Sequence, residues 1–119
     1  MNDTVSEQTK TDVTWRTVCT LDDLVVNSGV CALLDGQQIA LFYVPSSEEK
    51  VFAIGNYDPI GKAYVLSRGI VGSLQDELVV ASPLYKQHFS LRDGHCLEDE
   101  LSVPSFPARI DGQAIQIAL

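Results

Sequence analysis

Two short segments place an oxygen-bearing side chain directly before a proline, and these segments are the first candidates for chemistry. They read Asp58-Pro59-Ile60 and Ser82-Pro83-Leu84-Tyr85. Carboxylate and hydroxyl oxygens are ligands for hard metal ions, so a mononuclear metal held by Asp58 and Tyr85 is one interpretation. Asp and Ser before proline also hydrogen-bond the backbone of turns, which gives a purely structural alternative. The number and softness of these donors argue against a metal, so the sequence favours the structural alternative and predicts no bound metal on this chain.

The histidines and cysteines offer little further chemistry. His88 alternates with apolar neighbours along a predicted strand, so it is expected to face solvent and not to act as a catalytic base. His95 and Cys96 are adjacent, which sends their side chains to opposite faces and disfavours shared metal ligation. Cys31 lies in an apolar stretch and is predicted to pack in the core, as is Cys19. The sequence has no glycine-rich phosphate loop and no Ser-His-Asp signature.

The composition indicates one acidic globular domain. The chain has 119 residues, 45% of them hydrophobic, and a net charge of −8 from eight basic and sixteen acidic residues. The apolar content suffices for one buried core. Binding to nucleic acids or to anionic membranes requires clustered Lys and Arg, which this sequence lacks, so neither is expected as a partner. The longest apolar run, Ile39 to Val44, is far too short to span a membrane. Three cysteines without Cys-x-x-Cys spacing are typical of the reducing cytoplasm, where we expect the protein.

The order of β-patterned runs and turn residues predicts an all-β, antiparallel fold built from hairpins. Residues 1–11 are polar and aperiodic, so we expect a disordered tail without a signal peptide, followed by one domain at 12–119. Asp-Gly pairs at 35–36, 93–94 and 111–112 are strong hairpin signals. A single helical turn is expected at 21–24. The predicted strands are 15–19, 30–34, 39–44, 51–54, 78–81, 87–91, 95–97, 108–110 and 114–117.

The order of the segments resembles the cluster-binding half of a Rieske iron–sulfur domain. The similar pieces are 56–60, 66–69, 82–85, 89–91 and 93–94. In a Rieske domain the first loop reads Cys-Pro-His and the second Cys-Pro-x-His, and these residues hold the two irons. Here the prolines are in register, but the ligand positions carry Asp58, Ile60, Ser82 and Tyr85. The resemblance implies a Rieske-like β-sandwich or barrel without an iron–sulfur cluster.

Within that superfamily the chain is most similar to the small subunit of the cytoplasmic NAD(P)H-dependent nitrite reductase, a branch that itself lacks the ligands. The similar stretches are 29–34, 58–59, 65–69, 80–84 and 96–100. This resemblance implies a non-catalytic subunit with no cofactor of its own. Its expected partner is a large subunit that carries FAD, an iron–sulfur cluster and sirohaem and reduces nitrite to ammonia. The missing ligands argue against a Rieske-type electron carrier, and a stand-alone protein-interaction module stays as the alternative.

The resemblance also places a set of residues at the loop tips, the end of Rieske domains on which redox partners dock. The predicted contacts with the large subunit are Tyr57, Ile60, Tyr64, Tyr85, Lys86 and His88. Aromatic side chains at such a rim favour an interface. Ile60 and Tyr85 are also expected to pack between the loops in place of the cluster, so that Ile60→Ala costs a few kcal/mol. The acidic run 98–100 is expected to be a solvated loop, with docking of a basic partner as the alternative.

Overall fold

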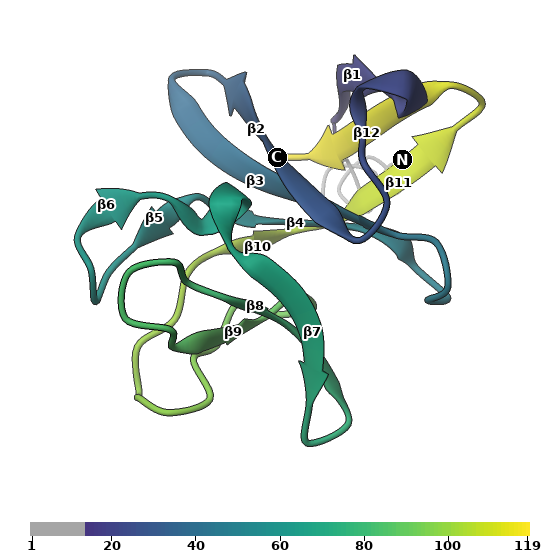
Figure 1. The fold of residues 1–119 in the computed structure, drawn as a ribbon. Coiled ribbons are helices and arrows are strands. Elements are labelled where there is room, and N and C mark those ends of the chain that lie inside the picture. Colours follow the sequence, from purple (N-terminus) through teal and green to yellow (C-terminus); the bar gives the residue numbers. More distant parts are fainter. Residues whose placement is uncertain (1–13) are drawn as a thin grey trace, which may run out of the picture.

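Short β-strands and tight turns make up nearly all of the described chain. The computed structural model describes residues 14–119, and the tail predicted at 1–11 lies outside them (Figure 1). The strands are β1 (Trp15–Thr20), β2 (Ser28–Leu34), β3 (Gln37–Val44), β4 (Lys50–Gly55), β5 (Tyr57–Asp58), β6 (Ala63–Tyr64), β7 (Ile70–Leu74), β8 (Glu77–Ala81), β9 (His88–Ser90), β10 (Ser105–Phe106), β11 (Ala108–Asp111) and β12 (Ala114–Ala118). Two 3₁₀ turns, η1 (Leu21–Asp23) and η2 (Leu66–Arg68), are the helical elements of residues 14–119. The predicted all-β class is confirmed.

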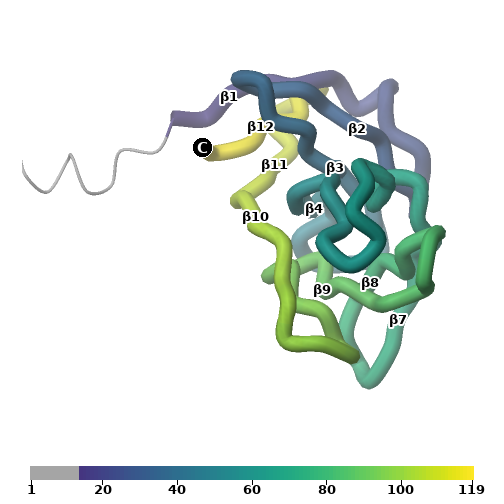
Figure 2. The backbone as a smooth tube through the Cα atoms, turned by 90° about the vertical axis from the view of Figure 1, so that its left-hand side faces the viewer, coloured from purple at the N-terminus to yellow at the C-terminus, as the bar shows by residue number. Residues whose placement is uncertain are grey.

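Three sheets lie one above another, with the longest strands in the middle. The central sheet has the order β10-β4-β3-β2, and the outer sheets have the orders β1-β12-β11 and β7-β8-β9. Figures 1 and 2 both show β1, β11 and β12 on one side of β3 and β4, and β7, β8 and β9 on the other. Neighbouring strands within the sheets are antiparallel. A short hairpin, β5-β6, follows the end of β4 and stands apart from these layers (Figure 1).

The Asp-Gly pairs form turns at the predicted places. Asp35 and Gly36 join β2 to β3 with φ values of +52° and +77°, the left-handed pair of a type I′ hairpin turn. Gly112, with a φ of +64°, turns β11 into β12. Gly94, with a φ of +80°, turns the chain after β9. The returning segment makes only an isolated bridge to β9, so the strand predicted at 95–97 is wrong.

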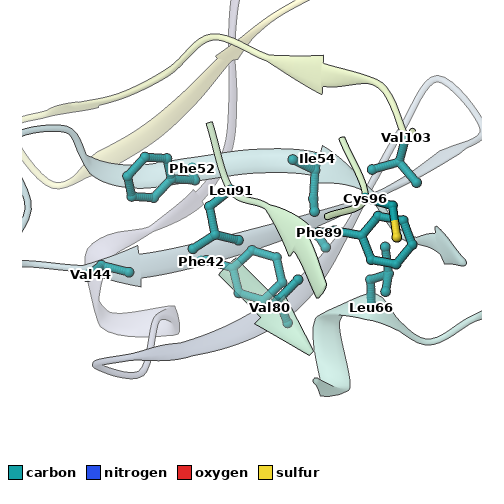
Figure 3. Packing of buried hydrophobic residues seen from close by; sticks show 11 residues of the cluster. Phe42, Val44, Phe52, Ile54, Leu66, Val80, Phe89, Leu91, Cys96 and Val103 are labelled. Atoms are coloured by element: carbon teal, nitrogen blue, oxygen red, sulfur yellow. The ribbon is translucent and has the colours of Figure 1, made fainter. Parts of the chain in front are cut away.

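The middle strands of the central sheet, β3 and β4, are buried on both faces, which explains the unbroken apolar run in β3. Side chains alternate across a strand, so neighbouring residues of β3 and β4 belong to different clusters. One face packs against β12 in a cluster whose buried members are Ile39, Leu41, Val51, Ala53, Ile115 and Ile117. The opposite face, shown in Figure 3, packs against β8, β9 and η2 in a cluster that we call the lower core; its buried members are Ala40, Phe42, Val44, Phe52, Ile54, Leu66, Val80, Phe89, Leu91, Cys96 and Val103. Both β3 and β4 therefore belong to two cores at once.

Two edge strands have no clear signal in the sequence. β7 pairs with β8 through a turn at Gln75 and Asp76, which take positive φ values of 55° and 65° without any glycine. β10 has only two residues and extends the central sheet beside β4, in a stretch flanked by Pro104 and Pro107. Within residues 14–119, no helix has the length and hydropathy that crossing a membrane requires.

Candidate functional site

The two proline-containing segments fold into loops of the same shape. Residues 58–62 read Asp-Pro-Ile-Gly-Lys, and residues 82–86 read Ser-Pro-Leu-Tyr-Lys. In each loop the amide of the fifth residue donates to the carbonyl of the first, at 2.7 Å and 3.0 Å. The side-chain oxygen of the first residue accepts from the amide of the third, at 2.8 Å and 3.3 Å. Both loops end on a lysine at positive φ, +59° at Lys62 and +65° at Lys86.

A hydrogen bond between Asp58 and Ser82 joins the two loops at their first residues. The Ser82 hydroxyl donates to Oδ2 of Asp58 at 2.5 Å, and the two residues are 1% and 0% exposed. Oδ1 of Asp58 accepts from the amides of Ile60 and Gly61, at 2.8 Å and 3.0 Å. The buried carboxylate therefore has three donors, which offset its removal from water. Asp58 and Ser82 therefore bond the backbone of their turns, as predicted for residues before proline.

The residues at the Rieske ligand positions do not fit a two-iron cluster. The cluster needs thiolate and imidazole donors, whereas Asp58, Ser82 and Tyr85 offer oxygen and Ile60 offers no donor. Asp58 and Ser82 also contact each other directly, although a bound cluster would separate them. A mononuclear metal shared by Asp58 and Tyr85 does not fit either, because the carboxylate is buried on three protein donors and Tyr85 is 65% exposed.

The apolar side chains expected between the loops take different positions. Ile60 is partly buried and packs against the lower core. Tyr85 is exposed, so its predicted packing between the loops is wrong. Leu84 lies against the other loop in its place, since a Cβ added to Gly61 would stand 2.5 Å from Cδ1 of Leu84. The loops approach closely at their hydrogen-bonded first residues, which leaves room between them only for Leu84 packed against Gly61. The ring of Tyr85 therefore faces solvent.

Ile60→Ala is expected to lower the free energy of unfolding by about 1–2 kcal/mol, because part of the side chain is removed from water against the lower core. Urea denaturation of the variant beside the parent chain measures this cost. Val25→Ala serves as the control, since Val25 is exposed in a loop and its truncation should cost less than about 0.5 kcal/mol. An equally small cost at Ile60 would contradict the packing of Ile60.

Asn56 is the residue of this site that the sequence pattern misses. It is 2% exposed and stands just before the first loop. Its Oδ1 accepts from the amide of Ser67 at 2.7 Å, and its Nδ2 donates to Oε1 of Gln38 at 3.0 Å. Asn56 therefore ties the base of the first loop to β3 and to η2. The only local signal is a polar residue at the end of an apolar strand, which is equally common in exposed loops.

The cysteines are less buried than the sequence predicts. Cys31 is exposed, so its predicted core packing is wrong: β2 is the outer strand of the central sheet, and this position lies on its uncovered side. Cys19 is partly buried beside the cluster of β12, and Cys96 is buried in the lower core. Burial raises the pKa of all three thiols. The thiols are therefore protonated at neutral pH, the form that is a poor nucleophile.

Aromatic side chains gather on the exposed side of the loops. Tyr57 and Tyr64 pair across the β5-β6 hairpin, with ring centroids 4.9 Å apart in an edge-to-face arrangement. They remain 40% and 57% exposed and line a cavity of about 400 Å³ that also reaches the β2–β3 turn. We call residues 57–64 and 82–88 together the loop end; Tyr85 and Lys86 belong to its second segment. Exposed aromatic rings beside a cavity are typical of interface anchors.

His88 is held by a carboxylate at the edge of the loop end. Its Nδ1 lies 2.5 Å from Oε2 of Glu98, and its amide donates to Oε1 of Glu98 at 2.8 Å. His88, predicted to face solvent, is partly exposed and pairs with Glu98. Asp99 and Glu100 are exposed, as expected of a solvated loop, whereas Glu98 bonds within the chain. His95 is exposed and its neighbour Cys96 is buried, so the two residues face opposite sides as predicted.

His95 stands between two carboxylates on the outer hairpins. Its Nδ1 lies 2.6 Å from Oδ1 of Asp93, and its Nε2 lies 3.8 Å from Oε1 of Glu77. The hydrogen bond to Asp93 raises the pKa of His95, and the charges of Asp93 and Glu77 add to this effect. The protonated ring is thus favoured in the folded chain.

This pairing predicts a small, pH-dependent contribution to stability. Because the folded pKa of His95 is raised, the contribution is fully present below the unfolded pKa of about 6.5 and is lost as the pH rises through the folded value. The groups are well exposed, so the contribution stays below about 1 kcal/mol. Urea unfolding of the parent chain and of His95→Gln should differ most near pH 5.5 and converge near pH 8.5. A difference that grows with pH would contradict the pairing.

Comparison with known proteins shows the family of the chain. The family described as a Rieske-like [2Fe-2S] domain matches residues 14–118. The nitrite reductase (NADH) small subunit of Salmonella typhimurium is 48% identical over 104 residues, which are 87% of this chain and 95% of that protein. The chain belongs to the nitrite reductase small-subunit family.

Two further relatives extend this assignment. The NMR structure of the Escherichia coli protein NirD matches with a TM-score of 0.81 at 45% identity, and the match covers 91% of this chain and 98% of NirD. The nitrite reductase [NAD(P)H] large subunit of Klebsiella oxytoca is 38% identical over 104 residues, covering 87% of this chain but only 11% of that protein. In that relative, a domain of the small-subunit kind is therefore part of a much longer polypeptide.

Proposed function

We propose that this chain is the cofactor-free small subunit of an NAD(P)H-dependent nitrite reductase, and that it supports a large subunit that reduces nitrite to ammonia. The observation that carries the proposal is the buried hydrogen bond between Asp58 and Ser82, at the positions where a cluster-binding relative has cysteine. The fold of an electron carrier is kept, and its electron-carrying site is replaced by a structural contact. The chain then acts through its surface.

The catalytic chemistry belongs to the large subunit in this proposal. The resemblance to this family implies that FAD, an iron–sulfur cluster and sirohaem are bound there, while the former ligand positions of this chain offer no thiolate or imidazole. The three cysteines have raised pKa values and are spread over different parts of the fold. Cytoplasmic location is part of the proposal and is supported by the three free thiols and by the redox chemistry of the relatives. The acidic composition argues against nucleic acid or an anionic membrane as a partner.

The proposed contact with the large subunit is the loop end, with Tyr57, Ile60, Tyr64, Tyr85, Lys86 and His88. The three tyrosines and Lys86 are exposed, and His88 and Ile60 are partly so. The Klebsiella oxytoca protein supports this partner, since a homologous domain is covalently joined to a large subunit there. Tethering of that kind keeps two surfaces at high effective concentration. A separate chain must achieve the same association through its own contacts.

The test is to add the purified chain to the isolated large subunit and to follow both association and turnover. Gel filtration reports complex formation, and nitrite-dependent oxidation of NADH or NADPH reports activity in the same samples. Co-elution with a rise in turnover or in enzyme lifetime is expected. Tyr57→Ala and Tyr85→Ala should weaken co-elution, whereas Leu33→Ala, an exposed change on β2, should leave it intact. Separate elution with unchanged activity would favour a stand-alone interaction module.

A further inference from the structure

Two segments of this acidic chain carry positive charge only, and the tips of the two loops lie within them. Residues 59–75 and 78–91 contain Lys62, Arg68 and Lys86 and no aspartate or glutamate. The rest of the chain then holds five of the eight basic residues and all sixteen acidic ones, a net charge of −11 against −8 for the whole. The only carboxylate within the loop end, Asp58, is buried and bonded to three donors. Charges separated in this way steer a partner of complementary charge.

The basic side chains of the loop end differ from most of the other described ones, because Arg16, Lys50, Arg92 and Arg109 bond within the chain and only Arg68, which is exposed, is like the loop-end lysines. Arg16 and Arg92 each form two hydrogen bonds to a carboxylate, and Lys50 donates to two backbone carbonyls. Among residues 14–119, the ion pairs and side-chain hydrogen bonds do not involve the ammonium groups of Lys62 or Lys86. Both lysines are exposed. They are therefore available to an external carboxylate without breaking an internal contact.

We propose that the loop end docks on an acidic face of the large subunit, with Lys62 and Lys86 as the charged contacts beside the tyrosines. This inference rests on the proposed function and adds the chemistry of the partner's face. The equivalent backbone hydrogen bonds of the two loops hold both lysines at the same position of the turn, and the Asp58–Ser82 contact joins the two loops at their first residues. Complementary charge of this kind raises the association rate and is weakened by salt.

The experiment measures binding of the full chain to the cofactor-loaded large subunit by surface plasmon resonance, at about 50 mM and about 300 mM NaCl. Lys62→Glu and Lys86→Glu are each expected to weaken binding about 5- to 10-fold at low salt, mainly through slower association. Lys50→Glu is the matched control, because it makes the same change in net charge at the start of β4. The turn between β3 and β4 lies on the side of the molecule opposite the β5-β6 hairpin (Figure 1). The effect of Lys50→Glu should stay below about 2-fold.

The outcomes separate this inference from the proposed function. Binding by the parent chain that falls with salt, together with selective loss in the two loop variants, supports an acidic docking face. Equal effects of all three reversals, or binding that strengthens with salt, would overturn it and leave the proposed function standing. No binding by the parent chain at either salt concentration would overturn both. Thermal unfolding of each variant shows that it is folded, so that a loss of binding reports on the surface.

Discussion

Replacing Asp58 with alanine is expected to lower the free energy of unfolding by about 3 kcal/mol, a large part of the stability of a domain of this size. The substitution leaves the Ser82 hydroxyl and the amides of Ile60 and Gly61 without their acceptor. Each buried donor that loses its partner costs about 1–3 kcal/mol. Urea denaturation monitored by the fluorescence of the single tryptophan, Trp15, or by circular dichroism measures the change.

Two further variants sharpen that result. Ser82→Ala removes one donor and leaves Asp58 its two amide donors, so it should cost about 1–2 kcal/mol. Asp22→Ala removes an exposed carboxylate in η1 and should cost less than about 0.5 kcal/mol. If Asp58→Ala were no more damaging than Asp22→Ala, the contact would not hold the loops together, and the structural basis of the proposed function would be lost.

Gly94→Ala is expected to destabilise the chain by at least about 3 kcal/mol. Gly94 has a φ of +80°, and a Cβ at this position would stand 2.1 Å from the carbonyl oxygen of Val103. That carbonyl belongs to the backbone, so the clash is not relieved by rotation of a side chain. Displacing it also disturbs the bond from the Val103 amide to the Gly94 carbonyl, which fastens the segment after β9 to the lower core. Denaturation midpoints and near-ultraviolet circular dichroism report the loss.

Gly112→Ala is the matched control for that substitution. Gly112 has a similar positive φ of +64°, but nothing lies within 4 Å of a Cβ placed there. The cost should therefore be limited to the left-handed backbone, about 1–2 kcal/mol. The difference between the two variants isolates the steric term from the backbone term. Equal losses would mean that Val103 moves aside and that the close approach has little energetic weight.

Local signals were sufficient for much of the fold. The type I′ turn at Asp35 and Gly36 follows from residue types that tolerate positive φ, and the alternation in β12 follows from one buried face. In β1 a register shift between Thr17 and Cys19 interrupts the alternation. The β7–β8 hairpin has the same left-handed turn at Gln75 and Asp76, where glutamine is not a turn-forming residue and no glycine is present. There the pairing of the flanking strands imposes a conformation that local propensity disfavours.

The candidate site was predictable in its positions and not in its contacts. The register of the two prolines located Asp58 and Ser82, and turn chemistry predicted that they bond the backbone. The bond between these two side chains joins residues 24 apart in sequence, and no pattern along one chain reports such a distance. The same reason hid Asn56, and it reversed the expectation for Tyr85: once the loops meet directly, an aromatic ring has no place between them. The repeated lysine at the fifth loop position is the signal that was available and would have added Lys62 to the predicted contacts.

Because β3 and β4 contribute to both cores, their sequences are expected to change slowly during evolution. Because both faces of these strands are covered, a substitution there disturbs two packed layers together, and few side chains are acceptable. The tips of the β5-β6 and β8–β9 connections lie outside both layers and carry exposed residues. Mutations at those tips can alter the choice of partner at little cost to folding. Such a division allows a small domain to follow changes in a much larger partner, residue by residue, while its scaffold stays constant.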